Sequence, residues 1–202
     1  MEKPKLKSTK LPKLKLSIRD SCFIGVFTAF IAASAQLSIP APTGVFTLQT
    51  FVIALAGIIL GAKKGALSAL VYVMVGAIGL PVFAGFKGGF GVVFGATGGY
   101  ILSFPLLALC AGIGSDLYDK YDKYKNMRVR NILPASGLFI GAAINYICGM
   151  LMGKFIISCG WREAVAVFVL PYIFIDAVKM AMAWIVGLGV KKVLSKIYKN
   201  NF

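Results

Sequence analysis

Residues 48–79 read LQTFVIALAGIILGAKKGALSALVYVMVGAIG, and this stretch decides the class of fold. It holds two apolar runs, 48–62 and 65–79, with only the lysine pair Lys63 and Lys64 between them. Apolar runs of this kind are stable in lipid as helices, because a helix bonds its backbone polar groups internally. A lysine pair between two such runs is typical of a turn at the membrane surface. The stretch therefore predicts two membrane helices joined by a tight turn.

Outward from this stretch, the composition of the whole chain indicates lipid as its solvent. Of the 202 residues, 58% are hydrophobic and 14% are charged, and the mean hydropathy is +0.83. These values lie outside the range of ordinary soluble domains. A bilayer core of about 30 Å requires about 20 apolar residues per helix. The chain therefore has room for six membrane helices with short connections, and none for a second, soluble domain.

The apolar runs divide the chain into six predicted membrane helices, at approximately 19–39, 48–62, 65–79, 97–113, 132–157 and 167–190. The segments 40–44 and 80–96 are rich in proline, glycine and phenylalanine, so we expect outer loops that fold back into the bundle. The expected organisation is a basic cytoplasmic N-terminal arm at 1–18, a six-helix membrane domain at 19–194 and a cytoplasmic C-terminal tail at 195–202.

Basic residues are concentrated between the apolar runs. The net charge is +15, and 18 of the 22 Lys and Arg residues fall in four blocks. The blocks are the residues before 20, the pair Lys63 and Lys64, the segment 120–130 and the segment 191–199. Under the positive-inside rule, their alternation with apolar runs places both termini in the cytoplasm. We favour this topological role, with contact to anionic lipid headgroups, over a nucleic-acid partner.

Few residues of the chain are suited to catalysis. There is no histidine, the four cysteines have no metal-ligand spacing, and no G-x-x-x-x-G-K-[ST] phosphate loop occurs. Asp116, Asp119 and Asp122 form a D-x-x-D-x-x-D run, but lysines interleave it and no second acidic motif accompanies it. We expect a solvated cytoplasmic loop there, and no metal site, no cofactor and no enzyme activity. A membrane-embedded transferase is disfavoured for the same reason.

Asp176 and Lys179 are the unusual charges, because they lie inside the last apolar run. Spaced three residues apart, they share one face of a helix. Ionisable groups at such depth face a partner or a cavity. Two interpretations stay open: a mutual ion pair that helps the bundle pack, or a site for a polar ligand near the outer end of the helix.

Three motifs, taken together, resemble one protein family. They are TLQTF at 47–51, running on to LAG at 55–57, then GAIGLPVFAG at 76–85, and GATGGY at 95–100. In this order they resemble the BioY family, the biotin-specific S components of energy-coupling-factor (ECF) transporters. The resemblance extends from the first to the last apolar run. It implies an all-α, six-helix S-component fold that captures biotin from the outer side of a prokaryotic cell membrane.

The resemblance also implies protein partners. S components associate with a transmembrane coupling subunit and two ABC-type ATPases, which fits the missing phosphate loop. Ala29 and Ala33 match the Ala-x-x-x-Ala pattern that S components use on their first helix against the coupling subunit. By itself a small-residue stripe indicates only close helix packing. The remaining transport hypothesis is an S component for another vitamin, such as riboflavin or thiamine.

The implied biotin site centres on Asp176 and Lys179, which match an acidic residue and a lysine that the family places there. The apolar part of the vitamin requires a pocket of aromatic and glycine residues. The expected contributors are Phe46, Phe83, Phe86, Gly98, Gly99 and Tyr100.

Two positions depart from the family pattern. Ala96 stands where members often carry a proline, so the entry into the fourth predicted helix is less rigid. Lys87 stands where small residues are more usual. Its side chain is either a solvated loop tip or an additional attraction for the carboxylate of biotin.

Overall fold

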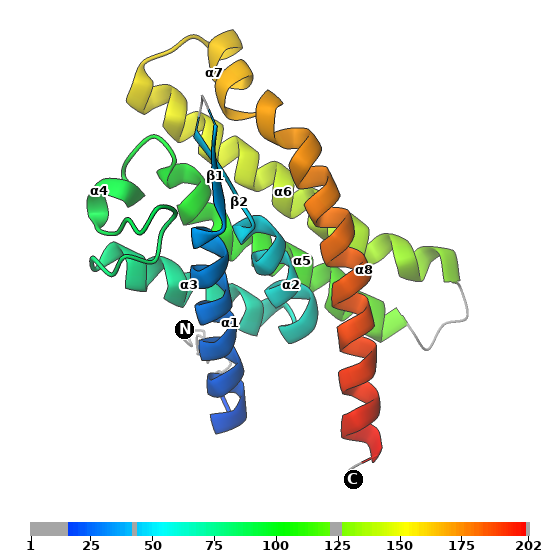
Figure 1. Ribbon diagram of the computed structural model, residues 1–202. Coiled ribbons are helices and arrows are strands. Elements are labelled where there is room, and N and C mark those ends of the chain that lie inside the picture. The colour runs from blue at the N-terminus through cyan, green and yellow to red at the C-terminus, as the bar shows by residue number, and fades with distance from the viewer. Residues whose placement is uncertain (1–15, 42–43, 122–126, 201–202) are drawn as a thin grey trace, which may run out of the picture.

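The computed structural model describes residues 16–41, 44–121 and 127–200 (Figure 1). Its helices are α1 Ile18–Gln36, α2 Gln49–Leu60, α3 Ala62–Ala77, α4 Phe90–Val93, α5 Gly98–Tyr121, α6 Met127–Ile157, α7 Trp161–Phe168 and α8 Leu170–Asn200. The strands are β1 Ser38–Ala41 and β2 Gly44–Thr47. Most of the expected N-terminal arm lies outside these residues. Helix α8 continues past residue 194, the predicted end of the membrane domain.

A helix occupies each of the six predicted apolar runs, but not every one is long enough to cross a bilayer. Among the described residues, four helices qualify by length and composition: α1, α5, α6 and α8. Helices α2 and α3 have 12 and 16 residues. At about 1.5 Å per residue they reach roughly 18 and 24 Å, short of a core of about 30 Å. The helical membrane architecture is thus confirmed, with four candidate spans.

The turn between α2 and α3 depends on Gly61. Its φ of +82° is rarely adopted by residues with a Cβ, and an added Cβ would lie 2.7 Å from the Asp116 carboxylate. That carboxylate accepts a hydrogen bond from the Ala62 N–H at 3.0 Å, which satisfies a free donor at the start of α3. The tight turn therefore lies at Gly61 and is held from α5, whereas Lys63 and Lys64, predicted as the turn, lie in the first turn of α3.

A short two-stranded hairpin follows α1 and adds to an otherwise helical fold. β1 and β2 pair antiparallel, with Ile39 opposite Phe46 and Pro40 opposite Val45. Branched and aromatic residues favour a strand, whereas Pro40 disfavours a helix. The described residues at both ends of the expected outer loop 40–44 are thus paired strands, which lie at one end of the bundle (Figure 1).

The last predicted helix is divided. The separate helix α7 begins at Trp161, between two predicted membrane helices, and α8 starts at Leu170. Buried Ala164 and Phe168 fix α7 against the bundle. The helix predicted at 167–190 joins the end of α7 to α8, because apolar residues continue through the junction.

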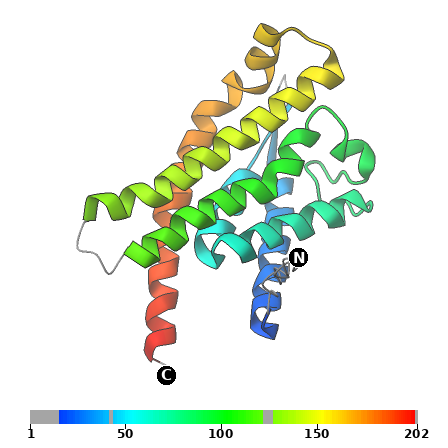
Figure 2. The same ribbon diagram turned by 180° about the vertical axis from the view of Figure 1, so that it is seen from behind.

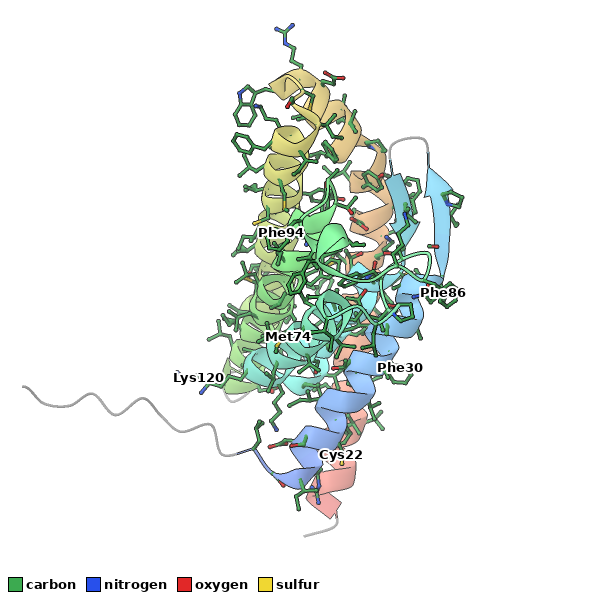
Figure 3. The ribbon with its side chains drawn as sticks, turned by 90° about the vertical axis from the view of Figure 1, so that its left-hand side faces the viewer. Cys22, Phe30, Met74, Phe86, Phe94 and Lys120 are labelled. Carbon is green, nitrogen blue, oxygen red and sulfur yellow. The ribbon has the colours of Figure 1, made fainter. Side chains whose placement is uncertain are left out.

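Side chains of the basic blocks form ion pairs at the end of the molecule opposite the hairpin. Lys64 binds Asp20 at 2.5 Å, and Lys191 binds Asp119 at 2.7 Å. Lys120 lies toward the same end (Figure 3). Asp116 and Asp119 lie on α5, so the prediction of a solvated loop is wrong for them, and Asp122 lies outside the described residues.

Helices α5 and α6 run side by side across the face of the molecule that Figure 2 shows.

Candidate functional site

A cavity of about 470 Å³ opens beneath the hairpin, within the range of about 300–1,000 Å³ that small-molecule sites occupy. Its walls come from β2, from α2, from the segment between α3 and α5, and from parts of α5, α6, α7 and α8. Most of the lining is apolar or aromatic, and three polar side chains of the lining converge on one carboxylate. This combination is typical of a site for a small, largely apolar ligand with a few polar groups.

The carboxylate is that of Asp176 on α8, and three side chains donate hydrogen bonds to it. The Tyr146 hydroxyl of α6 lies 2.6 Å from Oδ2. The Thr50 hydroxyl of α2 lies 3.2 Å from Oδ1, and the Lys179 ammonium lies 2.7 Å from the same oxygen. Three helices therefore converge on one group, which fixes its position at the cavity wall.

Asp176 and Lys179 form an ion pair and also line the cavity, so the two interpretations of the sequence are compatible. Their side chains are 16% and 11% exposed, and this exposure is to the cavity. An ammonium has three donors, and contacts with the described residues use one of them. Lys179 thus has donors left for a ligand, and the Asp176 oxygens have further lone pairs that can accept from one.

A chain of hydrogen bonds holds another part of the cavity wall. The Thr47 hydroxyl donates to Gln49 Oε1 at 2.9 Å, and Gln49 Nε2 donates to the Tyr72 hydroxyl at 2.6 Å. That hydroxyl donates to the Val82 carbonyl at 3.1 Å. The chain connects β2, α2 and α3 to the loop that follows α3, so these walls keep a fixed separation.

Aromatic rings make up the apolar part of the cavity. The Phe83 ring is buried against the Tyr72 ring, with 5.5 Å between centroids in an edge-to-face arrangement. The Phe46 ring of the hairpin lies 4.8 Å from that of Tyr172 on α8. The Tyr100 hydroxyl donates to the Phe168 carbonyl, which connects α5 to α7. An apolar ring system would meet aromatic surface on several sides.

The structure brings five of the eight predicted biotin-site residues to this cavity: Phe46, Phe83, Tyr100, Asp176 and Lys179. Gly98, Gly99 and Phe86 are not part of its lining. An added Cβ at Gly98 or Gly99 would collide with the backbone of α4 or α6, so these glycines permit close helix packing. Phe86 is 71% exposed and lies at the outer edge of its loop (Figure 3).

Several polar residues of the lining were not among the predicted site residues, and they include Thr50, Asn145 and Tyr146. Asn145 is buried and donates to Ser103 Oγ at 2.8 Å and to the Tyr100 carbonyl at 3.0 Å. An amide and a phenol inside an apolar run were a usable signal, since polar groups in membrane helices face a partner or a cavity. Lys87 is exposed and also lines the cavity, so both readings of its position fit.

Ala29 and Ala33 lie away from the cavity, on the exposed face of α1. Gly25, one turn earlier, has no atom within 4 Å of an added Cβ. This face of α1 is therefore not packed against the described part of the chain. Among the described residues there is also no group of His, Cys, Asp and Glu that could hold a metal ion.

The sequence of the chain is similar to a known family and to several known proteins. Residues 7–196 match the sequence model of the BioY family. The chain is 36% identical over 172 residues to the "Probable biotin transporter BioY" of Pyrococcus horikoshii, covering 85% of this chain and 96% of that protein. It is 38% identical over 168 residues to the "Biotin transporter BioY" of Thermotoga maritima, covering 83% and 93%.

A solved structure has the same fold. It is described as the S-component for biotin from an ECF-type ABC transporter, and it superposes with a TM-score of 0.74 over 87% of this chain and 92% of that chain. The sequences are 24% identical in this comparison, so the likeness concerns the fold.

Proposed function

The chain belongs to the BioY family, and from this membership we propose that it is the biotin-binding S component of an ECF transporter. Biotin is captured in the cavity beneath the hairpin, next to Asp176 and Lys179. The observation that carries the proposal is the hydrogen-bonded carboxylate and ammonium at the wall of an otherwise mostly apolar cavity.

The chemistry of biotin fits this cavity. Its ureido group has two N–H donors and one strong acceptor, its thiophane ring is apolar, and its valerate chain ends in a carboxylate. The Asp176 carboxylate accepts from a ureido N–H, and the Lys179 ammonium donates to the ureido oxygen or to the valerate. The rings of Phe46, Phe83 and Tyr100 surround the apolar remainder.

The topology follows from the distribution of charge. We infer six membrane segments at 19–194, with α2 and α3 as the short pair, and both termini in the cytoplasm. The ion-paired lysine end then faces inward, and the hairpin and cavity face outward, where biotin arrives. The membrane is the plasma membrane of a prokaryote.

Transport itself requires other subunits. The chain has no phosphate loop, so ATP hydrolysis belongs to a pair of ABC-type ATPases, linked through a transmembrane coupling subunit. The exposed Ala29 and Ala33 face of α1 is the proposed contact, because small side chains allow a partner helix to approach closely.

Isothermal titration of the full chain in detergent tests the ligand. Biotin should give saturable heat at one site per chain, whereas riboflavin and thiamine should give none. Binding of riboflavin or thiamine without a response to biotin would reject the assignment in favour of another vitamin.

A further inference from the structure

Gln36, the last residue of α1, uses both ends of its amide to hold the loop after α3. Its Nε2 donates to the Phe83 carbonyl at 3.1 Å and to the Val82 carbonyl at 3.3 Å. Its Oε1 accepts from the Phe86 N–H at 3.0 Å. These partners lie 46 to 50 residues further along the chain, so the contacts join two separate parts of the fold.

The loop that Gln36 holds forms part of the cavity wall. Phe83 and Lys87 both line the cavity, and their backbones bond each other in both directions, at 2.9 and 3.3 Å. Between them Gly85 has a φ of 70°, which glycine adopts readily, and Phe86 has a φ of 55°, which is uncommon for a residue with a Cβ. A non-glycine residue with positive φ persists when its surroundings hold it in place. The bond from Gln36 to the Phe86 N–H is such a restraint.

The same helix end also sets a second wall. Strand β1 starts two residues after Gln36, and its partner β2 carries Phe46 into the cavity lining. The end of α1 is therefore connected to the hairpin through the chain and to the 82–87 loop through the Gln36 amide. Both are outer walls of one cavity, beneath which Asp176 lies on α8.

We propose that Gln36 is a positioning residue for the vitamin: it keeps the 82–87 loop closed over the cavity and thereby slows the dissociation of biotin. This role rests on the proposed function, since it concerns retention of that ligand. Gln36 is not itself part of the cavity lining and acts through Phe83 and Lys87. Its loss frees the loop, so the off-rate of biotin rises more than the on-rate falls.

The main test replaces the amide with an apolar group of similar size, Gln36→Leu, in the full chain in detergent. Ser34→Ala is the matched control, because the hydrogen bond of the Ser34 hydroxyl stays within α1, to the Ile31 carbonyl. One readout is the dissociation of radiolabelled biotin during a chase with unlabelled biotin. The other is hydrogen exchange of the 82–87 segment without ligand.

Loss of three hydrogen bonds should raise the off-rate by about 10-fold in Gln36→Leu and speed exchange at Phe86 by at least about 5-fold. Ser34→Ala should match the unchanged protein in both readouts. Gln36→Glu serves as the conservative variant: it keeps an acceptor for Phe86 and lacks donors for the two carbonyls, so its off-rate should fall between those of Gln36→Leu and the unchanged protein.

The outcomes separate the two proposals. If the unchanged protein binds no biotin, the proposed function fails, and the role of Gln36 for that ligand fails with it. If the unchanged protein binds biotin, and Gln36→Leu and Gln36→Glu release it at the same rate as the unchanged protein, the positioning role alone is overturned. Equal exchange at Phe86 in all variants also overturns it.

Discussion

Replacing Asp176 by asparagine changes the centre of the site with almost no change in shape. The amide oxygen replaces only one carboxylate oxygen, so it can accept from Thr50 or from Tyr146 but not from both, and it carries no charge to pair with Lys179. The ammonium is then left without its ion-pair partner, with a side chain only 11% exposed. Asp176→Asn should therefore weaken both the binding of biotin and the stability of the protein.

The size of each effect follows from the geometry. A hydrogen bond to a charged group contributes about 1.5–3 kcal/mol, so its loss should weaken biotin binding by roughly 10- to 150-fold. Breaking a buried ion pair costs about 3–5 kcal/mol. Both side chains reach the cavity, where water screens them, so we expect a smaller loss of stability, about 1–3 kcal/mol.

A double variant separates the two effects. Asp176→Asn with Lys179→Met removes the unpaired cation, so stability should recover relative to Asp176→Asn while binding stays weak. Lys154→Met is the control for the lysine substitution. Lys154 lies on α6, over the rings of Trp161 and Phe155 at 4.7 and 5.2 Å, and is not part of the cavity lining.

Isothermal titration with biotin measures affinity, and thermal unfolding in the same detergent measures stability. Affinity within twofold of the unchanged protein in both Asp176→Asn and Lys179→Met would refute the reasoning. Recovery of full affinity in the double variant would show that the pair serves only the packing of the bundle.

Two further predictions concern other parts of the chain. Gly76→Ala places a methyl group against the Phe83 ring, so overpacking should cost about 1–3 kcal/mol in thermal unfolding and weaken biotin binding by titration, whereas Gly25→Ala, in open space, should leave affinity unchanged. Equal biotin affinity of the two variants would contradict this. Ala29→Leu and Ala33→Leu should abolish co-purification with the coupling subunit and keep biotin binding; intact co-purification would place the contact elsewhere.

Much of the helical architecture could be predicted from hydropathy. The division of residues 48–79 at the lysine pair was sufficient to place α2 and α3, and Gly61 explains the sharpness of the turn. The short lengths of α2 and α3 were also predicted, from the runs 48–62 and 65–79. Hydropathy does not separate a spanning helix from a short one enclosed by neighbours, so both were expected as membrane helices. The hairpin was missed because four-residue strands produce almost no periodic signal.

The site was predicted less completely, because it depends on contacts between distant segments. Asp176 and Lys179 were visible as charges in an apolar run, but Thr50 meets Asp176 across 126 positions and Tyr146 across 30. No local pattern encodes such pairs. Phe86 was expected from its residue type alone, yet the backbone of its loop turns the ring outward.

The central claim is that biotin occupies the cavity beside Asp176. An experimental structure of the full chain with biotin tests it most directly. Biotin should lie between the hairpin and α8, with a polar atom within hydrogen-bond distance of the Asp176 carboxylate or the Lys179 ammonium. Biotin bound outside this cavity, or bound within it without contact to either charge, would show that these two residues do not form its site.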